Sequence, residues 1–180
     1  MSTIPELPPE DWTLWRSVRA MNQHLGRELD RQLQRDAGIS QADYGILVTL
    51  FESPERQRRT GELGELLGWE KSRVSHQVAR MEARALVKRV ECEADGRGTW
   101  VTLTSDGTRA LLGAMRQHAV AIRELFLDQL EPAEKDVLRQ VSMRVLDNLN
   151  PEACEILDDS RLDDSGLDKS PSRVPQVATA

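Results

Sequence analysis

The sequence predicts a mainly α-helical chain with one small β-hairpin, and two observations support this. Apolar residues recur every three or four positions through most of the first 150 residues, which is the period of an amphipathic helix. Only between Leu86 and Thr104 does the period change to two, which is typical of a strand with one buried face. The predicted order is therefore four helices, a hairpin and two further helices, without internal repeats.

The first predicted helix spans residues 10 to 36. Its apolar positions recur at helical spacing: Trp15, Val18, Met21, Leu25, Leu29 and Leu33. Gly38 is expected to stop this helix, and Ser40 to cap a second helix that ends before Pro54. The residues ERQRR that follow are expected to form a polar loop, with Thr60 as the cap of the third helix.

Residues 61 to 84 are predicted to form two helices joined by a tight turn. The first helix ends at Gly68, and the second begins at Lys71. Two helices joined by a short turn that contains glycine, in about 20 residues, form the helix-turn-helix pattern. Gly64 weakens the first helix, a cost that is explained if the second helix approaches it closely.

The second helix of this pair separates into an inward and an outward set of side chains. Val74, Val78 and Met81 are spaced to lie inward, and the stripe is expected to continue to Ala85. The outward set is Ser72, Arg73, Ser75, His76, Gln77 and Arg80. Arginine and glutamine form paired hydrogen bonds with guanine and adenine edges in the major groove, and serine suits phosphates or bases. An ordinary solvated surface helix is the alternative, although no carboxylate lies between Glu70 and Glu82.

The hairpin follows this helix directly. In the first strand Val90 and Cys92 are expected on the inward side, and in the second strand Val101 and Leu103. The turn cluster ADGRG between them places Arg97 at the tip. A helix of this kind followed by a two-stranded wing is the winged-helix arrangement. An arginine there suits the minor groove, where negative potential concentrates, although Arg97 alone would be an ordinary loop arginine.

Two helices and a tail complete the chain. A long helix begins near Ser105, and Pro132 opens the last helix. From Pro151 onward the chain is rich in Asp, Ser and Pro without periodicity, so disorder is expected. The predicted organisation is an N-terminal arm and dimerisation helix (1–36), a winged helix-turn-helix lobe (37–104), C-terminal dimerisation helices (105–150) and an acidic tail (151–180).

Composition excludes several classes of function. No stretch is long and apolar enough to span a membrane, and the acidic, proline-containing start is unlike a signal peptide, so a cytoplasmic protein is expected. The net charge is −6, but residues 54–104 carry 10 basic and 8 acidic side chains and are the only positive block. There is no nucleophile with a neighbouring base, no phosphate-binding glycine loop and no metal-site spacing, so neither an enzyme nor a cofactor is expected.

The sequence resembles the MarR family of bacterial winged-helix transcriptional regulators from about Trp12 to Leu149. The resemblance lies in LGELLGWEKSRVSHQVARMEARALVKR, in the D-x-R wing signature at Asp95-Gly96-Arg97, and in LTSDGTRAL. It implies a homodimer that binds a palindromic operator in double-stranded DNA, most simply as a repressor, with Asp95 orienting Arg97. The expected DNA-binding residues are Arg58, Arg59, Thr60, Lys71, Ser72, Arg73, Ser75, His76, Gln77, Arg80, Asp95 and Arg97.

Two positions depart from the family pattern. His76 stands where many relatives carry arginine, so the contact there can differ in strength or respond to pH. Glu70 stands where Ser or Asp would be a better helix cap.

Dimerisation is also expected from the apolar pattern, because the terminal helices carry apolar stripes larger than a lobe of about 100 residues covers. Members of the family commonly bind small aromatic or phenolic anions between the dimer helices and the DNA-binding lobe. The candidate effector-binding residues are Trp12, Trp15, Arg16, His24, Met115 and His118, each of which also fits ordinary packing. A thiol switch is not expected from Cys92 or Cys154. A winged-helix protein-interaction module remains the alternative function.

Overall fold

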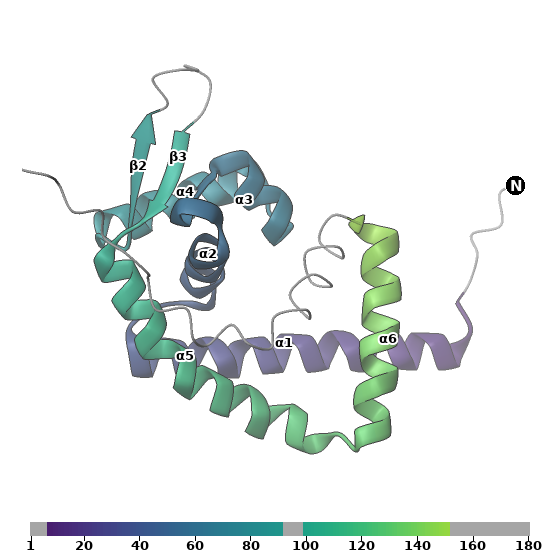
Figure 1. Ribbon diagram of the computed structural model, residues 1–180. Helices are drawn as coiled ribbons and strands as arrows, with labels where there is room; N and C mark the ends of the chain where they lie inside the picture. The colour runs from purple at the N-terminus through teal and green to yellow at the C-terminus, as the bar shows by residue number, and fades with distance from the viewer. Residues whose placement is uncertain (1–6, 92–98, 152–180) are drawn as a thin grey trace, which may run out of the picture. The chain divides into compact units, whose positions relative to one another are not determined.

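A computed structural model describes residues 7–91 and 99–151 of the chain (Figure 1). Its helices and strands, in order, are α1 (Pro9–Ala37), α2 (Gln41–Glu52), β1 (Gln57–Arg59), α3 (Thr60–Leu67), α4 (Lys71–Ala83), β2 (Val87–Glu91), β3 (Thr99–Leu103), α5 (Ser105–Leu125) and α6 (Pro132–Leu149). Two 3₁₀ turns, η1 (Pro54–Arg56) and η2 (Leu127–Gln129), lie between them. The mainly α fold with a small β wing is confirmed.

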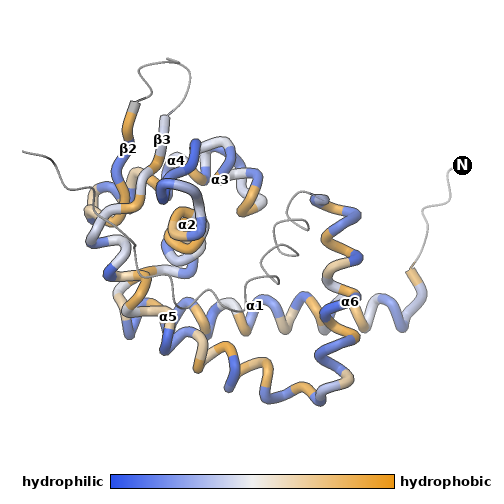
Figure 2. The backbone as a smooth tube through the Cα atoms, in the orientation of Figure 1, coloured by the Kyte–Doolittle hydropathy of each residue, from blue (hydrophilic) through white to orange (hydrophobic). Residues whose placement is uncertain are grey.

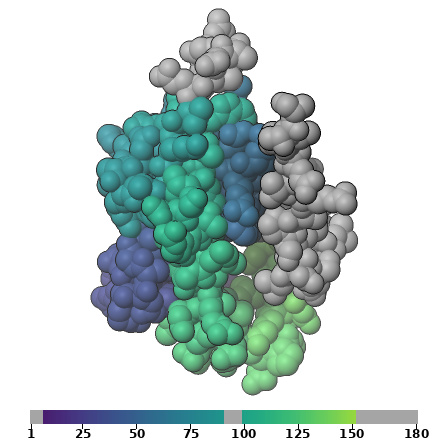
Figure 3. Space-filling model, turned by 60° about the vertical axis from the view of Figure 1, so that its left-hand side comes forward, coloured from purple at the N-terminus to yellow at the C-terminus, as the bar shows by residue number. Residues whose placement is uncertain are grey.

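The chain divides into two compact units, Met1–Pro132 and Ala133–Ala180. The first unit holds α1 to α5 and the sheet, and α2 is at the centre of its lobe, in contact with α1, α3, α4, α5 and β3 (Figure 1). Figure 2 shows α2 as a predominantly apolar segment. The part of α1 nearest the lobe lies beside α5 (Figure 3). In the second unit the described residues form α6.

Local sequence signals explain where the helices begin and end. Gly38 closes α1 in the left-handed conformation at φ 64°, where a side chain would be strained. Ser40 caps α2: its hydroxyl accepts from the Asp43 backbone N–H at 3.1 Å, and the Asp43 carboxylate accepts from the Ser40 N–H at 2.8 Å. Glu70 precedes α4 without a side-chain capping hydrogen bond.

The segment predicted as a polar loop is partly a strand, so that expectation was wrong. Gln57–Arg59 forms β1, which pairs antiparallel with β3 and gives the sheet order β1-β3-β2. The strand begins after η1, where Glu55 and Arg56 both have φ of 54°. Arg59, and not Thr60, is the cap residue of α3, and its backbone N–H donates to the Glu62 carboxylate at 3.3 Å. Three polar residues held by backbone pairing leave no periodic signal.

The core of the lobe contains most of the predicted inward residues. Val74, Val78 and Met81 are at most 1% exposed, as are Leu47 and Leu50 of α2. Val101 and Leu103 are buried on the inner face of β3, as predicted.

Two inward predictions were wrong. Val90 is 42% exposed because it lies on the outer face of β2, opposite Trp100, whereas Val87, three positions earlier and therefore on the other face, is buried opposite Leu103. Ala85 is exposed because α4 has already ended, and its φ of 57° takes the chain out of the helical repeat. Cys92 lies outside the described residues.

The junction between the wing and α5 is unusually close. The Leu86 carbonyl accepts from the Thr104 backbone N–H at 3.3 Å and from the Thr104 hydroxyl at 2.9 Å. The same hydroxyl caps α5 by accepting from the Gly107 N–H at 2.9 Å. A Cβ added at Gly107 would lie 2.0 Å from the Leu86 oxygen, so only glycine fits there.

Replacing Gly107 by alanine is therefore expected to destabilise the protein by about 2–3 kcal/mol, because the wing and α5 must separate to admit the methyl group. Gly113→Ala in the same helix is the matched control: a Cβ at Gly113 meets nothing within 4 Å. That control is expected to stabilise by about 0.5–1 kcal/mol through helix propensity alone. Urea unfolding of both variants measures the difference, and equal effects in the two variants would contradict the close approach.

Candidate nucleic-acid interface

The helix-turn-helix consists of α3, a turn at Gly68 and α4. Gly68 is left-handed at φ 62°, which ends α3 and reverses the chain. Gly64 is where the two helices come together: the Trp69 N–H donates to its carbonyl at 2.8 Å. A Cβ at Gly64 would lie 2.9 Å from the Trp69 carbonyl oxygen and 3.7 Å from Val74 Cγ2. The close approach predicted at Gly64 is present.

One face of α4 is exposed and carries no carboxylate. We call its six residues the recognition face: Lys71, Ser72, Arg73, Ser75, His76 and Arg80. All six are exposed, on the opposite side of the helix from the buried Val74, Val78 and Met81. The Arg73 guanidinium lies over the Trp69 ring, 4.2 Å from its centroid, which limits the positions that this cation adopts.

Gln77 does not belong to this face, although the sequence predicted it there. It is 5% exposed, and its Nε2 donates to Asp43 Oδ1 at 2.6 Å. Residue 77 lies three positions after Val74 and four before Met81, so it borders the inward stripe. Both polar atoms of its amide already have a protein partner, because its oxygen accepts from Arg80. The prediction that Gln77 lies on the outward face was wrong.

Arg58, Arg59 and Thr60, which were predicted to contact DNA beside α4, also make contacts within the lobe. Arg58 Nε donates to the Ser53 hydroxyl at 2.6 Å, and the Thr60 hydroxyl donates to the Thr99 carbonyl at 3.3 Å. The Arg59 guanidinium lies 5.2 Å from the centroid of the Trp100 ring. All three side chains are half-buried. Asp95 and Arg97 lie outside the described residues.

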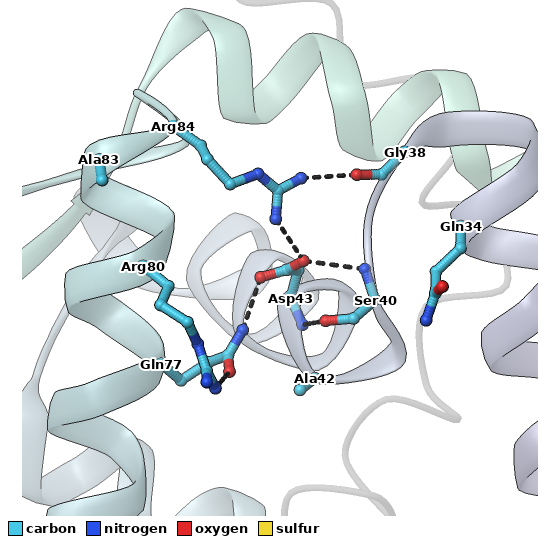
Figure 4. Close-up of a pocket in the computed structure, with 9 residues that line it drawn as sticks. All are labelled: Gln34, Gly38, Ser40, Ala42, Asp43, Gln77, Arg80, Ala83 and Arg84. Carbon is cyan, nitrogen blue, oxygen red and sulfur yellow. Dashed lines mark hydrogen bonds and ion pairs between the residues drawn. The ribbon is translucent and has the colours of Figure 1, made fainter.

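A buried polar cluster behind the recognition face was missed from the sequence. The Asp43 carboxylate, 1% exposed, accepts from Gln77 and from Arg84 Nη1 at 2.8 Å in addition to the Ser40 N–H (Figure 4). Arg84 Nη2 donates to the Gly38 carbonyl at 2.6 Å. These side chains line an open groove of about 810 Å³ (Figure 4). The Ser40-x-x-Asp43 spacing was the available signal, but it shows only a helix cap.

The pKa of Asp43 reflects opposing effects. Burial favours the protonated carboxyl, while the hydrogen bonds from the Ser40 backbone and from Arg84 favour the carboxylate. The hydrogen bonds and the Arg84 charge prevail, so the pKa of Asp43 is lowered from its ordinary value of 3.8. The cluster is therefore ionised at neutral pH.

The six candidate effector residues do not form one site in the described structure. Arg16 lies over the Trp12 ring, 5.9 Å from its centroid, and Trp15, His24 and Met115 are exposed. His118 is 5% exposed and lies against α1 and α2. Its Nδ1 is 2.8 Å from Gln32 Oε1, and its ring centroid is 4.5 Å from that of Tyr44. Because an amide oxygen only accepts, Nδ1 carries the proton.

No helix among the described residues is long and apolar enough to cross a lipid bilayer. Within the same residues, no group of three His, Cys, Asp or Glu side chains is arranged to hold a metal ion.

The exposed cationic helix, the helix-turn-helix and the wing strands together define a winged-helix DNA-binding protein. Comparison with known proteins agrees: a sequence model of the MarR family matches residues 37–98. YxaD, an uncharacterized HTH-type transcriptional regulator of Bacillus subtilis (strain 168), is 30% identical over 118 residues, which cover 65% of this chain and 80% of that protein.

Two solved structures from Streptomyces coelicolor are also similar. Sco3205, a MarR family transcriptional regulator in complex with DNA, has a TM-score of 0.78 at 37% identity, covering 84% of this chain and 95% of that chain. AbsC, a MarR family transcriptional regulator, has a TM-score of 0.76 at 32% identity, covering 83% of this chain and all of that one. The chain belongs to the MarR family, and it is a DNA-binding transcriptional regulator and not an enzyme.

The burial of His118 predicts a pH dependence of stability. Burial lowers the pKa of His118 below its ordinary value of 6.5, so the unfolded chain binds a proton more readily than the folded one. The contribution of neutral His118 to the free energy of unfolding is therefore fully present above pH 6.5. It is lost as the pH falls from there through the lowered pKa of the folded state. The measurement is urea unfolding between pH 7.5 and about 5.

In this measurement, His118→Gln is expected to reduce the decline, because a glutamine in that position does not titrate. His24→Gln, which changes an exposed histidine on α1, is the control and should keep the decline of the unaltered protein. A decline of equal size in all three proteins would exclude His118 as its source.

Proposed function

We propose that the protein is a repressor that acts as a homodimer on a palindromic operator in double-stranded DNA. The observation that carries the proposal is the recognition face, where six exposed polar or cationic side chains occur on one face of α4 without a carboxylate. A helix that needed only solvation would mix charges of both signs. The solved complex of Sco3205 with DNA supports the same use of the fold in a relative. A cytoplasmic location follows from this role.

We assign the residues of the recognition face by their chemistry. Arg73 is proposed to contact guanine edges in the major groove, and Ser72, Ser75 and His76 to contact bases or phosphates. Lys71 and Arg80 are proposed as phosphate contacts, together with Arg58, Arg59 and Thr60 from the flanking segment. Asp95 and Arg97 keep the wing-tip role that the family resemblance implies. Gln77 is left out because it is buried.

The homodimer is proposed from apolar surface that the chain does not cover. In the first unit, α1 exposes Leu14 (64%), Trp15 (55%) and Met21 (40%), and α5 exposes Leu112 (53%) and Leu125 (46%). In the second unit, α6 exposes a stripe at four-residue spacing: Val137, Val141, Val145 and Leu149. Pairing two chains would bury this surface and suit two half-sites about 34 Å apart. We therefore propose that residues 1–36 contain the N-terminal arm and a dimerisation helix, residues 105–150 the C-terminal dimerisation helices, and residues 37–104 the DNA-binding lobe.

The experiment is selection of bound duplexes from a random DNA pool, which is expected to enrich a palindrome with two equal half-sites. Arg73→Ala should relax the preference at one base pair of each half-site and cost about 1–3 kcal/mol there. Arg123→Ala, which removes an exposed arginine of α5 that pairs with Asp128, is the charge-matched control and should select the unaltered sequence.

Enrichment of a non-palindromic site would contradict the homodimer on a palindrome. A failure to enrich any sequence would favour the alternative, a winged-helix protein-interaction module.

We further propose release of DNA by a small aromatic or anionic effector, with Trp12, Trp15, Arg16, His24, Met115 and His118 as candidates. The pair of Arg16 and Trp12 is the part of this set that combines a cation with an aromatic face in the structure. In a thermal-shift screen of small aromatic acids, at least one compound is expected to raise the melting temperature and to release the selected DNA. Arg16→Gln should weaken both effects, and a screen in which no compound has either effect would refute effector release.

A further inference from the structure

Asp43 joins three parts of the lobe through one buried carboxylate. Its two oxygens accept from the Ser40 N–H at the start of α2, from Gln77 in the middle of α4, and from Arg84, the residue directly after α4. Arg84 also donates to the carbonyl of Gly38, the residue that closes α1. Gln77 and Arg84 are 34 and 41 residues away in sequence, so these contacts depend on the tertiary fold.

The two contacts on α4 fix more than its position. Residues 77 and 84 are seven positions apart, so they lie on one face of the helix, about 10.5 Å apart along its axis. The two side chains start from separate points along the helix and converge on the two oxygens of one carboxylate, so together they oppose rotation of this face of α4 away from α2. The apolar contacts of Val74, Val78 and Met81 determine which side of α4 faces the core, and the hydrogen bonds add a directional constraint to that packing.

A small rotation would be enough to disturb base contacts. A turn of about 20° moves a side-chain tip that is roughly 5–6 Å from the helix axis by about 2 Å. A hydrogen bond tolerates only a few tenths of an ångström around its preferred length. Recognition of bases by Arg73 therefore needs a helix whose rotation is set more finely than apolar packing sets it.

The cluster also reaches the recognition face directly. The Gln77 amide donates to Asp43 through Nε2 and accepts from Arg80 through Oε1. Arg80 is exposed, whereas Gln77 is 5% exposed, so the amide links the buried carboxylate to a cation on the surface. Because Asp43 takes the Nε2 group, the amide presents its oxygen to Arg80 and orients that guanidinium.

We propose that Asp43 is a positioning residue for sequence recognition: through Gln77 and Arg84 it sets the rotation of α4, and through Gln77 it orients Arg80. The inference rests on the proposed function, in which α4 contacts the bases. Asp43 itself is buried and contacts no DNA. Its effect is therefore expected on the discrimination between sequences, and not on the general attraction of the protein to phosphate.

The test compares affinities for the duplex that the unaltered protein selects and for a scrambled duplex of the same composition. Asp43→Asn replaces an accepting oxygen by an NH₂ group, which faces a donor of either Gln77 or Arg84. The ratio of the affinity for the selected duplex to that for the scrambled duplex is expected to fall at least about tenfold. A fall of this size corresponds to the loss of one good base contact. The affinity for the scrambled duplex and its salt dependence should change less than about twofold, because Arg80 and the other proposed phosphate contacts keep their charge and attraction to phosphate depends on charge more than on side-chain orientation.

Asp106→Asn is the matched control, since it removes the same charge from an exposed ion pair with Arg109 and should leave the ratio unchanged. Gln77→Leu breaks the links to Asp43 and Arg80 with little change in volume and keeps Arg84 in place. It should reproduce the fall in the ratio, and it alone decides the test if Asp43→Asn does not fold.

The outcomes separate the two proposals. If the unaltered protein selects no sequence, the proposed function fails and this inference falls with it. If it selects a sequence but the folded variants keep a ratio within about twofold of the original, only the positioning role of Asp43 is overturned. A lower melting temperature with an unchanged ratio counts as the second outcome, because it shows a structural role without positioning.

Discussion

The burial of one side of α4 is the constraint on which the rest of the lobe depends. Val74, Val78 and Met81 are at most 1% exposed, and burying side chains of this size contributes about 1.5–3 kcal/mol each. The same three contacts leave the recognition face outward, because the helical repeat turns the two sets to opposite sides. They also bring α3 against α4 at Gly64 and start the wing at Leu86, so the positions of both follow from how α4 is held.

Periodicity was sufficient to predict the long elements. The helix predicted for residues 10–36 is observed as Pro9–Ala37, and the inward stripe of α4 is correct up to Met81. Periodicity did not predict structure that depends on pairing with residues far away in the sequence. β1 is three residues long and exists because β3, more than 40 residues later, pairs with its backbone. The alternation in β2 was recognised, but Val90 was assigned to the inner face, which the register with β3 gives to Val87.

The sequence predicted that one face of α4 forms the candidate site, but it did not predict every residue of that face correctly. Arg73 and Gln77 are both long and polar, and both suit base recognition by chemistry. Gln77 is four residues further along the helix, which brings it to the edge of the buried stripe, where Asp43 accepts from it. The sequence contains no local sign of this contact, because the partner is on another helix. The polar side chains of α4 were therefore enough to predict a DNA-binding helix. Only the structure shows that Arg73 is exposed on the recognition face and that Gln77 is buried beneath it.

The junction at Leu86 has a mechanical consequence. Its carbonyl receives two hydrogen bonds from Thr104 and lies against Gly107 without space for a methyl group. With no side chain between them, the base of the wing and the first turn of α5 are in direct backbone contact. A shift of the first turn of α5 would therefore also displace the start of β2, because no flexible side chain separates the two backbones. In this geometry, glycine at position 107 makes the connection stiff because it brings two backbones into direct contact.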